Sequence, residues 1–220
     1  MERLCAHDLY RFYHTGDDEV AALRGVSLVL APGEIVAVTG PSGSGKSTLL
    51  NCLTGLDEPD AVQVTADGEL MTRRPEPVRA KLRARAFGIL MQSGNLFPHF
   101  TVADNIRFQM RMAGRMDEAR VDELIGAVGL NHRRDALPAH LSGGETARAG
   151  LAVALALDPP ILIADEPTAE VDRATEDDLL ALFEARRNSD LTTLIATHSE
   201  ALAHHADRIV RLKDGRVDHD

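Results

Sequence analysis

The chain has 220 residues, of which 44% are hydrophobic, enough for one substantial core with an inserted lobe but too few for two full domains of this size. Its 24 Lys and Arg residues stand against 34 Asp and Glu residues, which leaves a formal charge of -10. That balance, with no long basic run to reverse it, argues against a surface that binds nucleic-acid phosphates, so we expect no nucleic-acid partner.

The apolar segments argue against membrane insertion. The longest, residues 149–157, is far shorter than the roughly 20 residues that a helix needs to cross a bilayer. Residues 1–10 mix charged and apolar types and lack the continuous apolar stretch of a secretory signal. We therefore expect a cytoplasmic chain whose membrane role comes through a partner. Cys5 and Cys52 form no metal-binding pattern, so we expect reduced, structural thiols.

Short segments rich in Val and Ile alternate with longer helical patterns, which predicts a mostly parallel sheet with helices on its faces. Strand candidates at residues 4–12 and 20–30 come first and indicate a flanking antiparallel sheet. The buried strands are expected at residues 34–39, 87–92, 161–165 and 192–197. Near the end, residues 208–212 and 216–217 predict a strand pair joined by an Asp-Gly turn.

A helical period replaces the strand pattern between residues 105 and 140. One helix face there carries the apolar residues Val121, Leu124, Ile125 and Val128. This spacing predicts a helical lobe inserted between two strands. The same spacing recurs in Leu179, Leu182 and Phe183 after Asp172, which we expect to be a helix N-cap.

A phosphate-binding loop is predicted between the strand at residues 34–39 and the helix that follows. It satisfies the pattern GxxxxGK[ST] and comprises Gly40, Pro41, Ser42, Gly43, Ser44, Gly45, Lys46, Ser47 and Thr48. Its glycines allow a tight loop whose N–H groups point inward, and the helix N-terminus adds positive potential, so the loop can wrap a polyphosphate. We predict that Lys46 reaches the terminal phosphates and that Ser47 ligates Mg²⁺.

Two adjacent carboxylates, Asp165 and Glu166, end the apolar strand at residues 161–165. Neighbours on an extended chain face opposite sides, so they can take different roles. We predict that Asp165 holds Mg²⁺ and that Glu166 faces the attacking water. An Asp-Glu pair after a strand is common on its own; its place downstream of a phosphate loop favours this interpretation.

Residues 141–145 read Leu-Ser-Gly-Gly-Glu, the full LSGGE signature of ABC ATPases, about twenty residues before the carboxylate pair. With the motifs above, the chain resembles the nucleotide-binding domain of that family over nearly its whole length. In isolation Ser142, Gly143 and Gly144 fit a simple helix cap. The resemblance implies instead that they form a second anion cradle, which closes on the ATP of an opposite subunit in a head-to-tail dimer.

The family fold implied by this resemblance is α/β. It has a P-loop NTPase (RecA-like) core, a flanking antiparallel β subdomain and an inserted helical subdomain. We expect a single domain over residues 1–220. The core and its β part would take about residues 1–92 and 160–220, and the helical part about residues 93–150.

Four further residues match family positions. The resemblance implies that Gln92 contacts Mg²⁺ and water and links the site to the membrane partner. It implies that His198 contacts the γ-phosphate and steadies the attacking water with Glu166. Asp172 matches the aspartate of the loop that crosses the dimer interface, and Tyr13 matches the aromatic residue that stacks on adenine.

Together these matches imply a subunit that binds and hydrolyses MgATP. A second nucleotide-binding subunit, identical or different, and integral membrane permease subunits would complete an ABC transporter, with this chain at the cytoplasmic face of the membrane. Phosphoryl transfer to water needs mostly positioning and charge neutralisation, which we assign to Glu166, Lys46, His198, Mg²⁺ and Ser142 of the partner subunit. The aromatic segment at residues 95–100 either receives a helix of the permease or packs inside the helical lobe.

Within the family, residues 55–57 and 95–102 most resemble the group that includes lipoprotein-release, macrolide-export and cell-division ATPases. Thr146 and Ala147 depart from the usual pair of glutamines after the signature. The cell-division members supply the alternative of a regulatory ABC ATPase that signals across the membrane without transport. Soluble repair or translation ATPases need a long coiled-coil insertion or two cassettes, which 220 residues do not hold.

Overall fold

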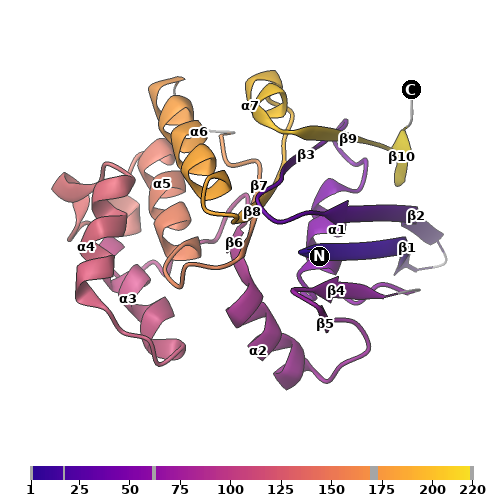
Figure 1. Cartoon of the computed structure of the whole chain (residues 1–220), viewed down its shortest axis with the longest axis horizontal. Helices are drawn as coiled ribbons and strands as arrows, with labels where there is room; N and C mark the ends of the chain where they lie inside the picture. Colours follow the sequence, from indigo (N-terminus) through magenta and orange to yellow (C-terminus); the bar gives the residue numbers. More distant parts are fainter. Residues whose placement is uncertain (1, 17, 61–62, 169–172, 219–220) are drawn as a thin grey trace.

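The computed structural model describes residues 2–16, 18–60, 63–168 and 173–218. Figure 1 shows a helical lobe at one end, an antiparallel sheet at the other and a parallel sheet between them. The strands are β1 (Leu4–Thr15), β2 (Asp18–Leu30), β3 (Ile35–Thr39), β4 (Val64–Ala66), β5 (Glu69–Leu70), β6 (Phe87–Leu90), β7 (Ile161–Asp165), β8 (Thr192–Ala196), β9 (Arg208–Lys213) and β10 (Arg216–Asp218). The helices are α1 (Lys46–Leu53), α2 (Glu76–Ala86), α3 (Val102–Met112), α4 (Glu118–Ala127), α5 (Gly143–Ala154), α6 (Arg173–Arg187) and α7 (Glu200–His205), with short 3₁₀ turns at Asn131–Arg133 and Pro138–His140.

The central sheet has the strand order β10-β9-β3-β8-β7-β6. All neighbours pair in parallel except the β9–β10 hairpin. Strands β7 and β8 are buried at every residue, as continuous apolar strands covered on both faces should be. The predicted parallel sheet is confirmed. Its register places Asp165 opposite Ala196 and Ala196 opposite Val38, so these strand ends share one edge.

The strand predicted at residues 87–92 is shorter in the structure. Strand β6 ends at Leu90, and Gln92 lies in the loop that follows. The physical reason is that β6 is the edge strand of the central sheet and pairs only with β7, so its ladder stops where the chain turns toward the helical lobe.

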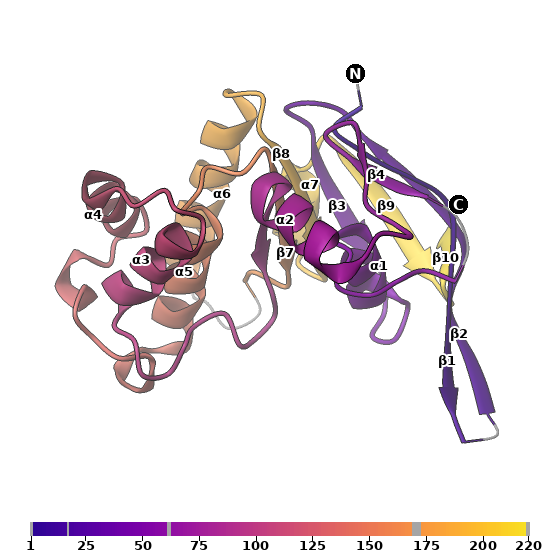
Figure 2. The same ribbon diagram turned by 90° about the horizontal axis from the view of Figure 1, so that it is seen from below.

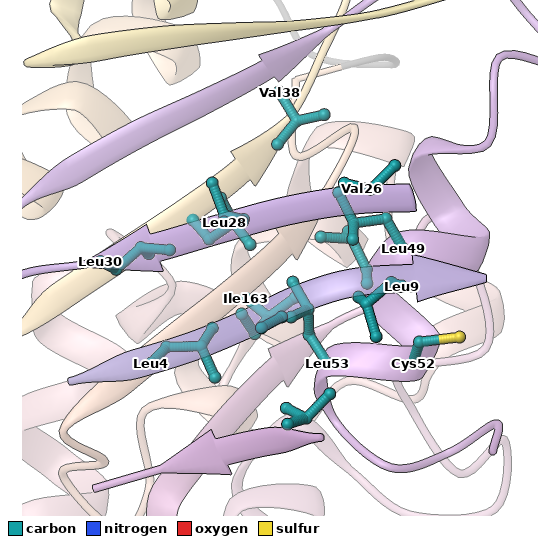
Figure 3. Packing of buried hydrophobic residues seen from close by; sticks show 14 of the residues in the cluster. Leu4, Leu9, Val26, Leu28, Leu30, Val38, Leu49, Cys52, Leu53 and Ile163 are labelled. Carbon is teal, nitrogen blue, oxygen red and sulfur yellow. The ribbon is translucent and has the colours of Figure 1, made fainter. Parts of the chain in front are cut away.

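A second sheet, with the order β2-β1-β4-β5, is antiparallel throughout, which confirms the expected flanking sheet. Strands β1 and β2 are longer than the sequence indicated and form a ribbon that extends beyond the other strands of this sheet (Figure 2). The inner part of the ribbon packs on α1 and the central sheet, and Figure 3 shows this core. Its labelled members include Leu4, Leu9, Val26, Leu28, Leu49, Leu53 and Ile163. Cys5 and Cys52 are buried free thiols.

The helical lobe lies between β6 and β7 in the chain and contains α3, α4 and α5. A second core joins these helices to α6 and to one face of the central sheet. The predicted apolar face is confirmed, because the four residues are all buried: Val121, Leu124, Ile125 and Val128. Helices α3 and α4 begin at side-chain caps, Thr101 and Asp117. Asp172, the expected N-cap of α6, lies outside the described residues. Across the described ranges, no helix has the length and apolar composition to span a membrane.

Candidate nucleotide-binding site

A cavity of about 680 Å³ opens at the carboxyl ends of β3, β7 and β8. Crevices at this edge of an open α/β sheet are the usual place for a ligand. Most of the predicted phosphate, metal and catalytic residues line it: Gly40, Pro41, Ser42, Gly43, Gly45, Lys46, Ser47, Thr48, Gln92, Asp165, Glu166 and His198. The fold therefore brings together motifs that are separated by up to about 160 residues in the sequence.

The glycines of the phosphate loop are required by close backbone contacts as well as by conformation. A Cβ atom on Gly40 would lie 2.1 Å from the carbonyl oxygen of Leu212 in β9, and one on Gly45 would lie 2.5 Å from that of Ala22 in β2. Both residues also have positive φ, 149° and 104°. Helix α1 begins directly after Gly45, so its N-terminal N–H groups face the cavity and favour an anion there.

Lys46 and Ser44 point in different directions from this loop. The Nζ atom of Lys46 donates to the carbonyl oxygens of Gly40 at 2.8 Å and Pro41 at 3.3 Å. Both acceptors are neutral, so the ammonium keeps its full charge at the loop. The side chain of Ser44 is buried, and its carbonyl oxygen accepts from Gly215 at 3.1 Å. Ser44 therefore anchors the loop to the β9–β10 turn and does not line the cavity.

Three of the lining residues fit a magnesium ion. Ser47, Gln92 and Asp165 offer a hydroxyl, an amide oxygen and a carboxylate, the oxygen donors that a hard cation prefers. Asp165 is only 4% exposed. Burial raises its pKa; the Ser47 hydroxyl lowers it, the charge of Glu166 raises it further, and the charge of Lys46 lowers it. A cation beside this carboxylate would offset the cost of burying its charge.

Glu166 and His198, which both line the cavity, are in direct contact. Nδ1 of His198 lies 2.9 Å from Oε2 of Glu166, and the backbone N–H of His198 donates to the same oxygen at 3.3 Å. The Glu166 side chain is 11% exposed and that of His198 is 72% exposed. Glu166 has a φ of 50°, a left-handed conformation that costs free energy in a residue other than glycine. The backbone N–H of Glu166 donates to the carbonyl oxygen of Ala196 at 2.8 Å. This hydrogen bond helps to hold the left-handed conformation and so fixes the direction of the Glu166 side chain.

The signature residues begin helix α5 with a capping box. The Oγ atom of Ser142 accepts from the N–H of Glu145 at 3.2 Å, and the Glu145 carboxylate accepts from the N–H of Ser142 at 2.9 Å. The simple cap considered from the sequence is therefore present. It does not compete with a role in anion binding, because a Ser142 hydroxyl that accepts through oxygen still has its proton to donate.

Glu145 itself is held by two residues from the 3₁₀ turn at Asn131–Arg133. Arg133 Nε donates to its carboxylate at 2.8 Å, and His132 Nε2 lies 3.4 Å away. The bond from Ser142, then Arg133, lowers the pKa of Glu145 to about 2. The carboxylate close to the N-terminus of α5 is thus already paired with a positive charge.

The signature does not line the phosphate-loop cavity in this chain. A second cavity, of about 340 Å³, lies between the loop after β6 and the first turn of α5. It is lined by Gln92 and Glu166 from the catalytic side and by Leu141, Gly143, Thr146 and Ala147 from the signature side. Ser142 and Gly144 line neither of these two cavities.

Tyr13 lies at the edge of the site. Its hydroxyl donates to Asp57 at 2.7 Å, and the guanidinium of Arg11 sits 4.7 Å from its ring centroid. Tyr13 does not line the cavity, but its cross-strand neighbour Val20 does. Stacking of Tyr13 on adenine stays a prediction. Asp172, predicted at the dimer interface, lies outside the described residues.

Some lining residues were missed by sequence reasoning. Val20, Ala21, Ala22 and Arg24 from β2, and Asp214 and Gly215 from the β9–β10 turn, complete the cavity wall. The Asp-Gly turn was predicted, but nothing local in the sequence places it beside the phosphate loop.

The aromatic segment after β6 packs against helix α3 of the helical lobe, which is one of the two alternatives expected for it; docking of a permease helix stays a prediction. Phe97, Phe100 and Phe108 pack together with ring centroids 4.9 to 5.5 Å apart. Phe97 nevertheless remains 53% exposed.

The chain resembles known proteins over nearly its full length. A family model described as "ABC transporter" matches residues 23–169. The lipoprotein-releasing system ATP-binding protein LolD 2 of Caulobacter vibrioides is 40% identical over 219 residues, which cover 98% of this chain and 96% of that protein. The macrolide export ATP-binding/permease protein MacB of Syntrophobacter fumaroxidans is 35% identical over 99% of this chain, which spans 31% of that protein. Among solved structures, the chain matches a dimer of the ATP-binding cassette MJ0796 in a post-hydrolysis state bound to ADP and Pi. The two sequences are 31% identical, the TM-score is 0.94, and the match covers 98% of this chain and 97% of the MJ0796 chain.

Proposed function

The chain belongs to the ABC transporter family, and on that premise we propose that it is the ATP-binding subunit that hydrolyses MgATP at a head-to-tail dimer interface to power a membrane-embedded transporter. The resemblance drawn from its motifs is confirmed by the family match and by relatives of nearly the same length. It is an ATPase with the P-loop cassette fold.

The observation that carries this function is the meeting of three chain segments in one cavity. Lys46 from the phosphate loop, Asp165 and Glu166 from the end of β7, and His198 from the end of β8 all line it. A solitary phosphate loop would suit many nucleotide-binding proteins. Here the loop shares its cavity with the buried carboxylate of Asp165, which suits a metal ion, and with the Glu166 carboxylate paired with His198. This combination suits hydrolysis by water.

In the proposed reaction the N-terminus of α1 and Lys46 bind the β- and γ-phosphates. Ser47, Gln92 and Asp165 would hold Mg²⁺, which neutralises phosphate charge when bound. Glu166 orients the attacking water and accepts its proton. His198 holds the Glu166 carboxylate in place through Nδ1 and is proposed to contact the γ-phosphate.

A second subunit is part of the proposal because Ser142 lies outside the cavity of its own chain. In the head-to-tail arrangement, Ser142, Gly143 and Gly144 of each subunit would cap the ATP of the other, with the N-terminus of α5 as the anion-binding end. The dimeric state of the solved cassette supports this arrangement. Asp172 is proposed to cross the same interface, and Tyr13 to stack on adenine.

The membrane partner is proposed to dock beside Gln92. The exposed Phe97 and its packed neighbours Phe100 and Phe108 offer an aromatic surface suited to a short partner helix. LolD 2 is named as part of a lipoprotein-releasing system and MacB as an export permease, so a permease with this chain at its cytoplasmic face is the assembly that these relatives favour.

Affinity capture tests the proposal. The Glu166→Gln variant is captured with ATP from detergent-solubilised membranes, and the co-purifying proteins are identified by mass spectrometry, with Lys46→Ala as the matched control. We expect a stoichiometric multi-span protein with the first variant. Recovery of soluble partners alone would contradict the transporter function, whatever the ATPase activity of the chain.

A further inference from the structure

Arg11 and Tyr13 of β1 and Asp57 of the loop after α1 are in mutual contact, and we call them the Arg11–Asp57–Tyr13 triad. Arg11 Nε donates to Oδ2 of Asp57 at 2.9 Å, and its Nη2 lies 2.8 Å from Oδ1, so both oxygens of the carboxylate are engaged. The hydroxyl of Tyr13 donates to Oδ2 of the same carboxylate at 2.7 Å. A two-pronged Arg–carboxylate pair of this kind is geometrically specific.

The triad holds the Tyr13 ring as well as its hydroxyl. The guanidinium carbon of Arg11 lies 4.7 Å from the ring centroid, within the range of a cation–π contact. One face of the Tyr13 ring is therefore covered by the Arg11 guanidinium, and the hydrogen bond from the Tyr13 hydroxyl to Asp57 limits rotation of the side chain. Since Arg11 and Asp57 come from β1 and from the loop after α1, the ring is tied to the helix that begins at the phosphate loop.

Tyr13 does not line the cavity itself, but it neighbours two residues that do, Val20 and Thr48. Tyr13 pairs with Val20 across the β1–β2 ladder, so the two side chains share a face of the ribbon. Val20 lines the cavity and is 55% exposed despite being apolar. Burial raises the pKa of Tyr13 and the bond to Asp57 adds to this, while Thr48, another lining residue, lowers it. Tyr13 thus adjoins the cavity wall from strand β1.

We propose that Arg11 and Asp57 are positioning residues that pre-form a nucleobase platform from Tyr13 and Val20. The proposal rests on the proposed function, in which this cavity binds ATP. A ring already fixed by a cation on one face and a carboxylate at its hydroxyl loses little further freedom when a base stacks on it. The base would then lie against the exposed apolar side chain of Val20, which has no other evident reason to face a polar cavity.

The competing explanation is that the triad only ties the loop after α1 to β1. Asp60 supplies a matched control for that function. Its carboxylate accepts from Phe12 N–H at 2.8 Å and lies 3.3 Å from Nη1 of Arg11, so it joins the same loop to the same strand. Among the polar contacts of Asp60 in the described structure, none is to Tyr13.

The test compares ATP with inorganic tripolyphosphate, which has the phosphates and lacks the base. Binding of each ligand, with Mg²⁺, is measured by calorimetry for the wild type, Asp57→Asn, Arg11→Gln and Asp60→Asn. We expect Asp57→Asn and Arg11→Gln to weaken ATP binding about three- to tenfold, the range of an aromatic stacking contact, and to leave tripolyphosphate binding unchanged. Asp60→Asn should change neither affinity.

Each other outcome is decisive. Equal weakening of both ligands by Asp57→Asn would overturn the proposal and leave the triad a structural tie. Unchanged ATP binding in both triad variants would overturn it as well. A wild type that binds ATP no more tightly than tripolyphosphate would remove the base platform while leaving the ATPase function standing. A wild type that binds neither ligand would instead contradict the proposed function.

Discussion

His198 and Glu166 are joined twice at one carboxylate oxygen. Nδ1 of His198 lies 2.9 Å from Oε2 of Glu166, and the backbone N–H of His198 donates to that oxygen at 3.3 Å. The residues follow the ends of adjacent parallel strands and are 32 positions apart in the sequence. Because both contacts use Oε2, they orient the carboxylate and leave its second oxygen out of the contact. The pair is therefore arranged to fix one oxygen of the base while the other oxygen can accept a hydrogen bond from the attacking water.

Removing the base should stop hydrolysis while preserving ATP binding. Glu166→Gln keeps the shape of the side chain but cannot accept a proton, so we expect phosphate release to fall about 10²- to 10⁴-fold. His198→Ala should also slow phosphate release, because it removes the orienting contact. Phosphate release and equilibrium ATP binding are measured on the same preparations. Hydrolysis by Glu166→Gln at the wild-type rate would remove Glu166 from the catalytic role.

Removing the positive charge of Lys46 should instead weaken ATP binding itself. Lys46 Nζ contacts only neutral carbonyls of its own loop among the hydrogen bonds described, so its charge is available to phosphates. Lys46→Ala should weaken ATP binding about 10- to 100-fold, the scale of a charge-assisted hydrogen bond. An ATP-dependent dimer that forms equally in Lys46→Ala and Glu166→Gln, measured by size-exclusion chromatography, would contradict both site assignments.

Replacing the buried carboxylate should separate stability from function. Burial is the main cause that raises the pKa of Asp165, so its charge costs stability in the folded state when no cation is bound. This cost is present above the folded-state pKa of Asp165, where the carboxyl is ionised, and absent below that pKa, where the carboxyl is protonated. At neutral pH in EDTA, Asp165→Asn should therefore raise the melting temperature by about 2–4 °C. The same variant should lose Mg²⁺-dependent hydrolysis; a lower melting temperature would show that Asp165 is already compensated by its neighbours.

The elements that the sequence predicted well are those with local causes. Strands β7 and β8 are buried on both faces, which demands a continuous apolar segment. The phosphate loop needs glycines at fixed spacing because backbone approaches it closely at Gly40 and Gly45. Both features leave a readable pattern within about ten residues of sequence.

The parts that the sequence did not predict depend on distant pairings. Tyr13 is directed by Asp57, 44 positions away, and no periodicity encodes that bond. The turn at Gly215 reaches the phosphate loop only because β9 pairs with β3, and that choice of neighbour has no local signature. The extent of β6 was overestimated because an edge strand ends where its single partner no longer continues, which apolar composition does not reveal.

The capping box of the signature helix should contribute stability that depends on pH. The pKa of Glu145 is lowered to about 2, first by the N–H of Ser142 and then by Arg133. A carboxylate with a depressed folded-state pKa stabilises fully above its unfolded value, 4.5, and loses that contribution as the pH falls toward 2. Urea unfolding of wild type and Glu145→Gln should therefore differ at pH 7 and converge in acid.

The control for that comparison is Glu123→Gln, since the Glu123 side chain is 65% exposed and lies on the surface of α4. Surface pairs of this kind contribute little to stability, so we expect its unfolding curve to follow the wild type at each pH. A difference between wild type and Glu145→Gln that stays constant from pH 7 into acid would contradict an ionised capping carboxylate.

The β9–β10 turn should be needed for the shape of the phosphate loop. Gly215 N–H donates to Ser44 O at 3.1 Å, and its carbonyl accepts from Arg24 N–H at 2.7 Å, so the turn links the loop to β2. A Cβ atom on Gly215 would lie 2.7 Å from the carbonyl oxygen of Ala22. Gly68 has nearly the same backbone, with φ 79° against 75°, but a Cβ there meets nothing within 4 Å.

Comparing Gly215→Ala with Gly68→Ala isolates this contact. Both substitutions carry the strain of a left-handed alanine, about 1–2 kcal/mol of unfolding free energy, which denaturant titration measures. Only Gly215→Ala should also displace β2 and the loop, so we expect it to lose more stability and to weaken both ATP and tripolyphosphate binding, because the phosphates are common to the two ligands. If the two variants lost equal stability and both kept wild-type tripolyphosphate affinity, the turn would support the fold without shaping the phosphate site.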